Sequence, residues 1–293
     1  MAIYGKAGKG LIISILGLIL VILGVLWITV IFPALDKLPT DYGRDYYFDC
    51  TYEEWNAATR TFDVIPARMT RAQEAVGTAD GALLIREVRT VVNTETGEVM
   101  PRYAEESILA VNRSTNEFAT ELDERSRWGY WGPPRPLSEG DSFDMWNPGA
   151  LQPLQAVYVD TEEFCKDSRC MEVFKYNLQG ADIPIGVEPQ SGGNLTFTAD
   201  IDLWIEPTSG TVVYQESETS TSLETMGMKF PVQISYVHYA DETIDTLMDV
   251  GENARTMLMW FKSILPLVLI IVGAVLVLAD VLFLSRRRKA EES

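Results

Sequence analysis

Two long apolar segments, one near each end of the chain, limit what this sequence can fold into. Leu11 to Phe32 contains no charged residue and is followed by Pro33, and Ile264 to Leu284 contains only Asp280. At about 1.5 Å of rise per residue each segment forms a helix about 30 Å long, the hydrocarbon thickness of a bilayer. A cleaved signal peptide has a shorter apolar core and a small-residue cleavage site, so the first segment is predicted to remain as an anchor.

Basic residues flank both apolar segments on the side of the chain ends. Lys6 and Lys9 precede the first segment, and Arg286 to Lys289 follow the second. Because positively charged flanks stay in the cytoplasm, both termini are predicted to be cytoplasmic. The predicted domains of this cell-membrane protein are a cytoplasmic N-terminus (1–10), a transmembrane helix (11–32), an extracytoplasmic β-rich domain (33–240), a juxtamembrane helix (241–263), a second transmembrane helix (264–284) and a basic cytoplasmic tail (285–293).

Glycines line one face of the first apolar segment. Gly10, Gly17 and Gly24 recur every seven residues, and Gly273 lies at the middle of the second segment. Because glycine lets helix backbones approach closely, these positions predict helix packing. The packing is either within one chain or between copies in a homo-oligomer. Asp280 is predicted to reach water or the following arginines, with an ion or proton path as the alternative.

The segment between the two apolar runs has the pattern of strands and turns. Asn194 to Glu206 alternates apolar and polar side chains, which is typical of a strand with one buried face. Polar runs that end in glycine or asparagine predict hairpin turns. The predicted fold class is therefore α+β, with a mainly antiparallel twisted sheet or half-barrel between two transmembrane helices. Further predicted strands are Arg44–Cys50, Thr61–Ala67, Leu83–Val92, Tyr103–Asn112, Glu117–Leu122, Leu154–Val159, Met171–Leu178, Thr211–Glu216 and Phe230–Tyr239.

Two segments interrupt this pattern. Arg127 to Pro153 is rich in aromatic residues and proline and is predicted to be a loop. Its rings either pack over the open end of the sheet or bind a carbohydrate, lipid or peptide. In the juxtamembrane helix, Gly251 is a predicted point of interruption. The candidate binding loop comprises Trp128, Tyr130, Trp131 and Trp146.

Cysteine usage fits an oxidising exterior. Cys165 and Cys170 bracket a short polar turn and are predicted to form a disulfide, with two free thiols as the alternative. Cys50 is left over and is either a buried thiol or part of an intermolecular bridge. Asn112 and Asn194 stand in Asn-x-Ser/Thr sequences and are candidate glycosylation sites.

Charge and motif content restrict the function. The formal net charge is −18, and the basic ends make the central domain more acidic still, which disfavours nucleic acid as a partner. His238 is the one histidine and is predicted to be structural. The sequence holds no hydrolase, nucleotide-binding or zinc motif. No catalytic residue, cofactor or metal site is predicted, and the protein is predicted not to be an enzyme.

Four segments resemble the PorA-like porin family. They match the family's turn, tryptophan-containing, strand and hairpin motifs, although Asn116 stands where the family has glycine. The resemblance covers nearly the whole chain and implies a cell-envelope membrane protein without a known catalytic residue. The four segments are Val111–Glu117, Phe143–Pro148, Met171–Tyr176 and Leu203–Val212.

Two functions follow from these observations, and a third, an envelope hydrolase, would require clustered carboxylates in a cleft. The first is a non-enzymatic envelope protein whose acidic outer domain binds a lipid, a glycan or a surface-protein partner. The alternative is an oligomeric porin, channel or transporter component. Strands that span a membrane need an apolar outer face, whereas these strands read as water-soluble. A pore would therefore require several copies of the helices.

Overall fold

The computed structural model describes residues 4–189 and 191–291, with side-chain surroundings for 12–189 and 191–283. The chain divides into two compact units. One consists of the two ends of the chain, Met1–Lys37 and Arg255–Ser293, and its described residues are mainly helical. The other, Leu38–Ala254, holds the sheet and is called the β unit below.

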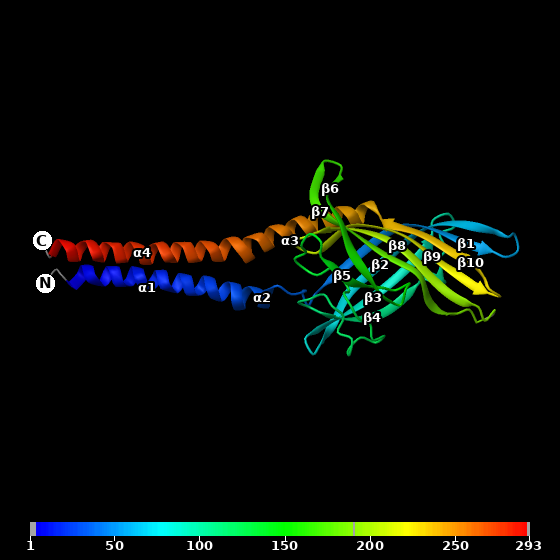
Figure 1. The fold of residues 1–293 in the computed structure, drawn as a ribbon, viewed down its shortest axis with the longest axis horizontal. Helices are drawn as coiled ribbons and strands as arrows, with labels where there is room; N and C mark the ends of the chain where they lie inside the picture. The colour runs from blue at the N-terminus through cyan, green and yellow to red at the C-terminus, as the bar shows by residue number, and fades with distance from the viewer. Residues whose placement is uncertain (1–3, 190, 292–293) are drawn as a thin grey trace. The chain divides into compact units, whose positions relative to one another are not determined.

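The helical unit consists of two antiparallel helical segments that pack along their length (Figure 1). A Cβ atom at Gly17 would lie 2.6 Å from the carbonyl oxygen of Gly273, so the two backbones touch where both residues lack side chains. A Cβ atom at Gly24 would lie 2.7 Å from Ile270 Cγ1. Gly10 belongs to the first helix, but its surroundings are outside the described side chains. The segments are α1 (Tyr4–Leu26), η1 (Trp27–Ile31) and α2 (Phe32–Leu35), and η3 (Met259–Ile264) and α4 (Leu265–Glu291).

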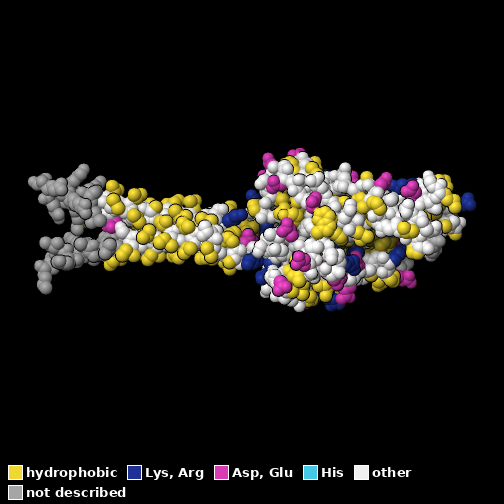
Figure 2. Space-filling view, turned by 60° about the horizontal axis from the view of Figure 1, so that its bottom comes forward, with side chains coloured by type: hydrophobic (Ala, Val, Ile, Leu, Met, Phe, Trp, Pro, Cys, Tyr) yellow, Lys and Arg dark blue, Asp and Glu magenta, His cyan; other side chains and the backbone are white. Residues whose placement is uncertain are grey.

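The remaining surface of the helical unit is apolar. Figure 2 shows hydrophobic side chains covering its described part, and the helical stretches Ile12–Leu35 and Asp241–Phe283 are long and apolar enough to cross a bilayer. Ser14 Oγ donates a hydrogen bond of 2.5 Å to Asp280 Oδ2. Asp280 is only 7% exposed, which argues against contact with water, while the arginines predicted to pair with it lie outside the described side chains. The carboxylate instead links the two helices, because a polar group in an apolar setting takes any donor within reach.

The β unit is built on one ten-stranded sheet in which every neighbouring pair is antiparallel. The strand order is β4-β3-β2-β1-β10-β9-β8-β7-β6-β5. Strands that are adjacent in the sheet are also consecutive in sequence, except for β1 and β10, and β4 and β5 are the two edge strands. The sheet curls into a half-barrel (Figure 1), which confirms the predicted fold class. The strands are β1 (Gly43–Asn56), β2 (Thr61–Ala79), β3 (Ala82–Asn93), β4 (Glu105–Asn112), β5 (Ser142–Asn147), β6 (Gln152–Lys166), β7 (Arg169–Val187), β8 (Asn194–Glu206), β9 (Thr211–Thr225) and β10 (Met228–Tyr239), with the short 3-10 helix η2 (Pro101–Tyr103) before β4.

Three local predictions are wrong. The predicted loop Arg127–Pro153 contains β5, an edge strand too short for its alternation to stand out among turn residues. The predicted strand Glu117–Leu122 forms only isolated bridges, because its second half turns back. Gly251 does not interrupt α3 (Asp241–Leu258), because it is buried where the helix crosses β8 and β9. A Cβ atom added at Gly251 would lie 3.6 Å from Glu206 Cβ.

The connection between the edge strands β4 and β5 also links them by hydrogen bonds, and we call its residues 116–131 the strap. Asn112 N donates to Glu117 O, Phe118 N to Gly129 O, and Tyr130 N to Asp144 O, so backbone hydrogen bonds run from β4 through the strap to β5. A buried ion pair of 2.9 Å between Asp123 and Arg127 fixes the turn of the strap. The strap therefore occupies backbone N–H and C=O groups of the edge strands that could otherwise pair with a strand of another chain.

Apolar side chains on the inner face of the curl form the core of the β unit. One cluster spans β5–β8 and includes Phe143, Tyr176 and Phe197. Another joins β1 to α3 through Phe48 and Leu247. Acidic residues of α3 also pair with basic residues of the strands, which holds the start of this helix against the sheet. These pairs are Arg68–Glu242, Lys166–Asp241, Lys166–Asp245, Arg169–Asp245 and Arg169–Asp249.

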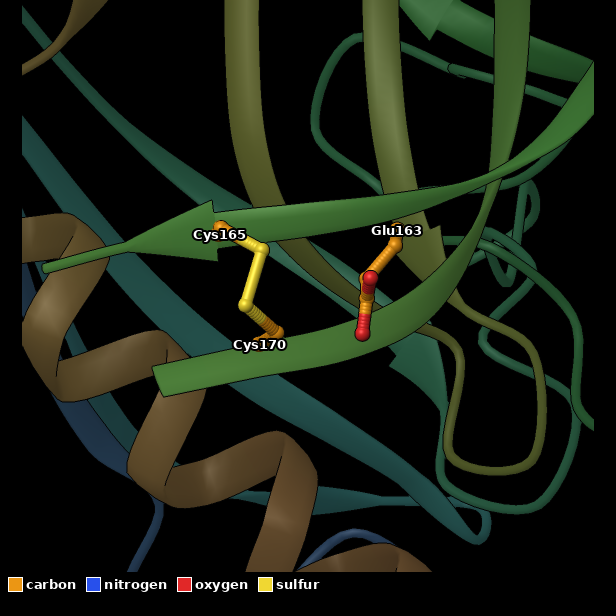
Figure 3. A group of neighbouring side chains, drawn as sticks. All are labelled: Glu163, Cys165 and Cys170. Carbon is orange, nitrogen blue, oxygen red and sulfur yellow. A yellow bond between two sulfur atoms is a disulfide. The ribbon is translucent and has the colours of Figure 1, made fainter. Parts of the chain in front are cut away.

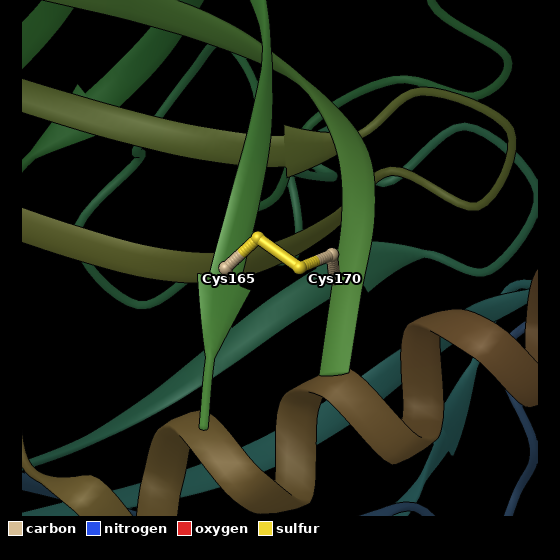
Figure 4. Close-up of a disulfide and its surroundings, with 2 residues drawn as sticks. All are labelled: Cys165 and Cys170. Carbon is tan, nitrogen blue, oxygen red and sulfur yellow. A yellow bond between two sulfur atoms is a disulfide. The ribbon is translucent and has the colours of Figure 1, made fainter. Parts of the chain in front are cut away.

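The hairpin β6–β7 carries the predicted disulfide. Cys165 and Cys170 are a cross-strand pair and their sulfur atoms are bonded (Figure 4), which confirms the prediction. Cys50 is a free thiol on the buried face of β1. Burial raises the pKa of this thiol to about 12, so it stays protonated and unreactive at neutral pH.

Thiol labelling of the three cysteines tests this arrangement. We expect the folded, non-reduced chain to take up no iodoacetamide at pH 8, because Cys50 is buried and protonated. Unfolding without reduction should allow one label, and unfolding with reduction should allow three. Intact mass spectrometry counts the labels, and three labels without reductant would contradict the disulfide.

Candidate functional site

Two rows of polar side chains cross the inner face of β1–β4, where apolar residues are expected. In the first row Arg44 pairs with Gln73, which pairs with Glu87. In the second row Tyr46 pairs with Arg71, which pairs with Arg89. Successive residues on one face of a strand are two apart, so the two rows lie side by side on one face. The rows, completed by β4, are Arg44–Gln73–Glu87–Ser107 and Tyr46–Arg71–Arg89–Glu105, and we call these residues the polar grid.

The polar grid belongs to the buried face of the sheet. Tyr46, Gln73 and Ser107 are buried, and the five charged members are half-buried. The intervening residues Asp45, Arg86 and Glu106 point the other way and are exposed. Glu105 and Arg89 retain 27% and 29% side-chain exposure, so water reaches this edge of the grid.

Apolar rows flank the polar grid along the strands. On one side, the same face continues as the row Phe48–Met69–Val91. On the other side it continues as Ala75–Ile85–Leu109. The inner face of β1–β4 is therefore amphiphilic, with charge in the middle and apolar side chains above and below.

Positive charge exceeds negative charge within the grid. It contains three arginines and two glutamates, and both carboxylates already have partners. Gln73 Nε2 donates to Glu87 Oε2 at 2.5 Å. Glu105 forms ion pairs with both Arg89 and Arg125, the second reaching in from the strap. Neither Arg44 nor Arg71 forms an ion pair with any residue that the structure describes.

Aromatic side chains surround the two arginines that lack a carboxylate. Arg71 Cζ lies 4.7 Å from the centre of the Tyr46 ring and 5.2 Å from that of Phe48. Arg44 Cζ lies 5.8 Å from the centre of the Tyr42 ring. Such cation–π contacts contribute about 0.5–2 kcal/mol, less than the several kcal/mol that desolvating a cation costs.

Protonation states in and around the grid follow from burial and charge. Burial alone would lower the pKa of Arg71, but Glu87 and the nearby tyrosine hydroxyls raise it above its ordinary value. Arg71 is therefore a cation at any physiological pH. Burial raises the pKa of Tyr239 to about 12 despite the opposing effect of Arg71, and it raises the pKa of Tyr42 as well. Both phenols keep their protons and can donate hydrogen bonds.

The predicted aromatic binding residues lie in and beside the strap. Tyr130 bridges the strap to β5 and packs edge-on against Phe143, and Trp131 packs edge-on against Tyr42 with ring centres 5.6 Å apart. Trp146 lies on β5 beside Phe118 of the strap. Trp128 is the exposed member, at 52%. Trp131 thereby connects the strap to Tyr42 at the border of the polar grid.

Two further groups of polar residues lie on the sheet surface. Glu163, Cys165 and Cys170 place potential ligand atoms within 4.8 Å of one another (Figure 3), but the sulfur atoms are bonded to each other and offer no thiolate to a metal. On the outer face of β8–β10, a hollow of about 300 Å³ is lined by carboxylates and includes His238. Its carboxylates are Asp200, Asp202, Glu216 and Glu218, of which Asp202 pairs with Lys175 at 2.7 Å.

The candidate glycosylation sites are both exposed. Asn112 ends β4, and its side-chain oxygen accepts hydrogen bonds from Ser114 N and Thr115 N, which closes the turn into the strap. Asn194 begins β8. Sequence reasoning missed the polar grid, since its rows appear only once the register of four strands is known. The available signal was polar residues at strand positions where the alternation calls for apolar ones. In β2, Arg71 and Gln73 continue the every-second-residue series that begins with Ala67 and Met69.

Comparison with known proteins places the whole chain in one family. A family model described as porin PorA matches residues 9–282, which include all ten strands and most of both helical segments. No protein with a curated description matches the chain. The match confirms the resemblance found in the sequence motifs. The chain is therefore a membrane protein that belongs to the porin PorA family.

Proposed function

We propose that this protein is a non-enzymatic envelope protein that is anchored at both ends and binds a lipid on the inner face of its sheet. The observation that carries the proposal is the polar grid between two apolar rows. A lipid has the same division, because its head group requires polar partners and its chains require apolar ones. A glycan would find few hydrogen-bonding groups beyond the grid, and a surface protein would need an outward-facing site. Lipid is therefore the best fit among the three ligand classes.

The proposed topology places the β unit outside the cytoplasm. Lys6 and Lys9 before α1 and Arg286 to Lys289 at the end of α4 favour a cytoplasmic position for both termini. The Cys165–Cys170 disulfide is consistent with an oxidising compartment around the β unit. Anchoring at both ends would keep a lipid-binding sheet next to its source of lipid.

Topology is testable with a membrane-impermeant maleimide on intact cells. We expect Thr59→Cys, in the exposed turn between β1 and β2, to be labelled without permeabilisation, because the β unit lies outside. Ala290→Cys, in the basic tail, should be labelled only after lysis. Labelling of the tail in intact cells, or protection of residue 59, would contradict this topology.

Lipid retention tests the proposed activity. We expect full-length protein purified in mild detergent to carry bound lipid in native mass spectra. Met69→Trp enlarges a side chain in the apolar row beside the grid and should reduce binding of a short-chain lipid about tenfold, equal to about 1.4 kcal/mol. Val159→Gln, at an exposed position of β6, is the matched control and should bind normally. Absence of lipid from the purified wild-type chain would refute the proposal.

An oligomeric channel is the second candidate, and the description of the family as porins favours it. The strands are poor candidates for a lipid-embedded wall, since the outer face of β8 and β9 carries Asp200, Asp202 and Glu216. The pore would have to form from helices of several copies. However, Gly17 and Gly273 already pack against each other within one chain.

Planar bilayer recording and in-membrane cross-linking separate the two candidates. We expect the purified chain to produce no conductance steps and to cross-link as a monomer, because its small-residue contacts are used intramolecularly. Protein from empty-vector membranes is the control for contaminating channels. Reproducible conductance together with a cross-linked oligomer would favour the channel instead.

A further inference from the structure

We propose that Arg71 and Arg44 bind the phosphate group of an anionic lipid, which deepens the proposed function and rests on it. Both guanidinium groups lie on the inner face of the sheet and have no carboxylate partner among the described residues. The Nε atom of Arg71 is buried and has no hydrogen-bond partner in the described chain. A desolvated donor on a cation is costly unless an anion meets it.

The carboxylates of the grid are already engaged by other groups. Glu87 accepts a hydrogen bond from Gln73, and Glu105 is shared between Arg89 and Arg125. Neither carboxylate can turn to Arg71 without leaving a partner behind. The excess of arginine over carboxylate in the grid therefore predicts that a ligand bound there is an anion.

Phosphate fits the arrangement better than other anions. A guanidinium group presents parallel N–H donors that match two oxygens of a phosphate, and two arginines can share one phosphate group. Tyr239 stays protonated and adds a neutral donor at the border of the grid, whereas Tyr42 already donates its proton to Gln73 Oε1 at 3.1 Å. Arg44 and Arg71 come from adjacent strands and adjacent rows, since Arg44 pairs with Gln73 and Tyr46 pairs with Arg71.

The apolar rows identify a lipid as the source of the phosphate. Phe48, Met69 and Val91 border the row that contains Arg71. Ala75, Ile85 and Leu109 border the row that contains Arg44. The chain itself already buries Phe48, Val91, Ile85 and Leu109, whereas Met69 and Ala75 are only half-buried. Free phosphate would use the arginines alone, whereas an acyl chain attached to the phosphate would also contact Met69 and Ala75.

Binding of matched short-chain probes to full-length, delipidated protein in detergent tests the inference. The probes are dihexanoyl phosphatidic acid, dihexanoylglycerol, which has the same chains without phosphate, and inorganic phosphate. We expect phosphatidic acid to bind more tightly than either of the others. Arg71→Gln and Arg44→Gln should each weaken its binding roughly 10–100-fold, the usual effect of losing a charge-assisted hydrogen bond. Arg71→Lys should keep part of the affinity, because lysine retains the positive charge but lacks the parallel N–H donors of the guanidinium group.

Arg86→Gln is the matched control. Arg86 lies on the outer face of β3 and pairs with Glu106, so its loss should leave probe binding unchanged. Near-UV circular dichroism checks that each variant is folded, and Arg44→Gln provides an independent variant if Arg71→Gln does not fold.

The outcomes separate this inference from the proposed function. Equal binding of dihexanoylglycerol and phosphatidic acid, or unchanged binding in folded Arg71→Gln and Arg44→Gln, would overturn the phosphate site and leave lipid binding intact. Inorganic phosphate binding as tightly as phosphatidic acid would overturn the assignment to a lipid. Failure of all three probes and absence of copurified lipid would overturn both proposals.

Discussion

A protein interior accepts an arginine only where its charge is compensated, and this requirement governs the inner face of β1–β4. Alternation along each strand sends Arg44, Arg71 and Arg89 to the same side of the sheet as the apolar core. Glu105 forms an ion pair with Arg89, whereas Arg71 has only the charge of Glu87 nearby without an ion pair, and aromatic rings surround Arg44 and Arg71. An interior that served stability alone would be better packed with apolar side chains. The polar grid is therefore the basis of the proposal that this face binds a ligand.

Closure of the sheet keeps this face on the inside. The strap connects β4 to β5 by backbone hydrogen bonds, and the buried Asp123–Arg127 pair holds its turn. Arg125, from the same strap, reaches Glu105 in the grid, and Trp131 packs against Tyr42 beside it. The strap thus both bridges the two edge strands and contacts side chains in and beside the polar grid. The antiparallel register of four strands then fixes the spacing of the charges.

Much of the architecture follows from the sequence because single segments encode it. Charge-free stretches of membrane length predict α1 and α4, and strict alternation predicts β8. The spacing of Cys165 and Cys170 predicts the disulfide, since a short polar turn brings the two residues opposite each other. β5 and the strap were not predictable in this way, because their residues pair with distant segments and show no periodicity of their own. The grid depends on register, which is a property of several strands together.

A high-resolution experimental structure of the full chain, purified from its native membrane without delipidation, tests the central claim most directly. The account predicts non-protein density within hydrogen-bonding distance of the Arg71 guanidinium, on the same side of the sheet as Phe48 and Tyr239. It also predicts that Glu87 remains bonded to Gln73. A structure in which Glu87 turns to pair with Arg71 and no density lies beside the arginines would contradict it.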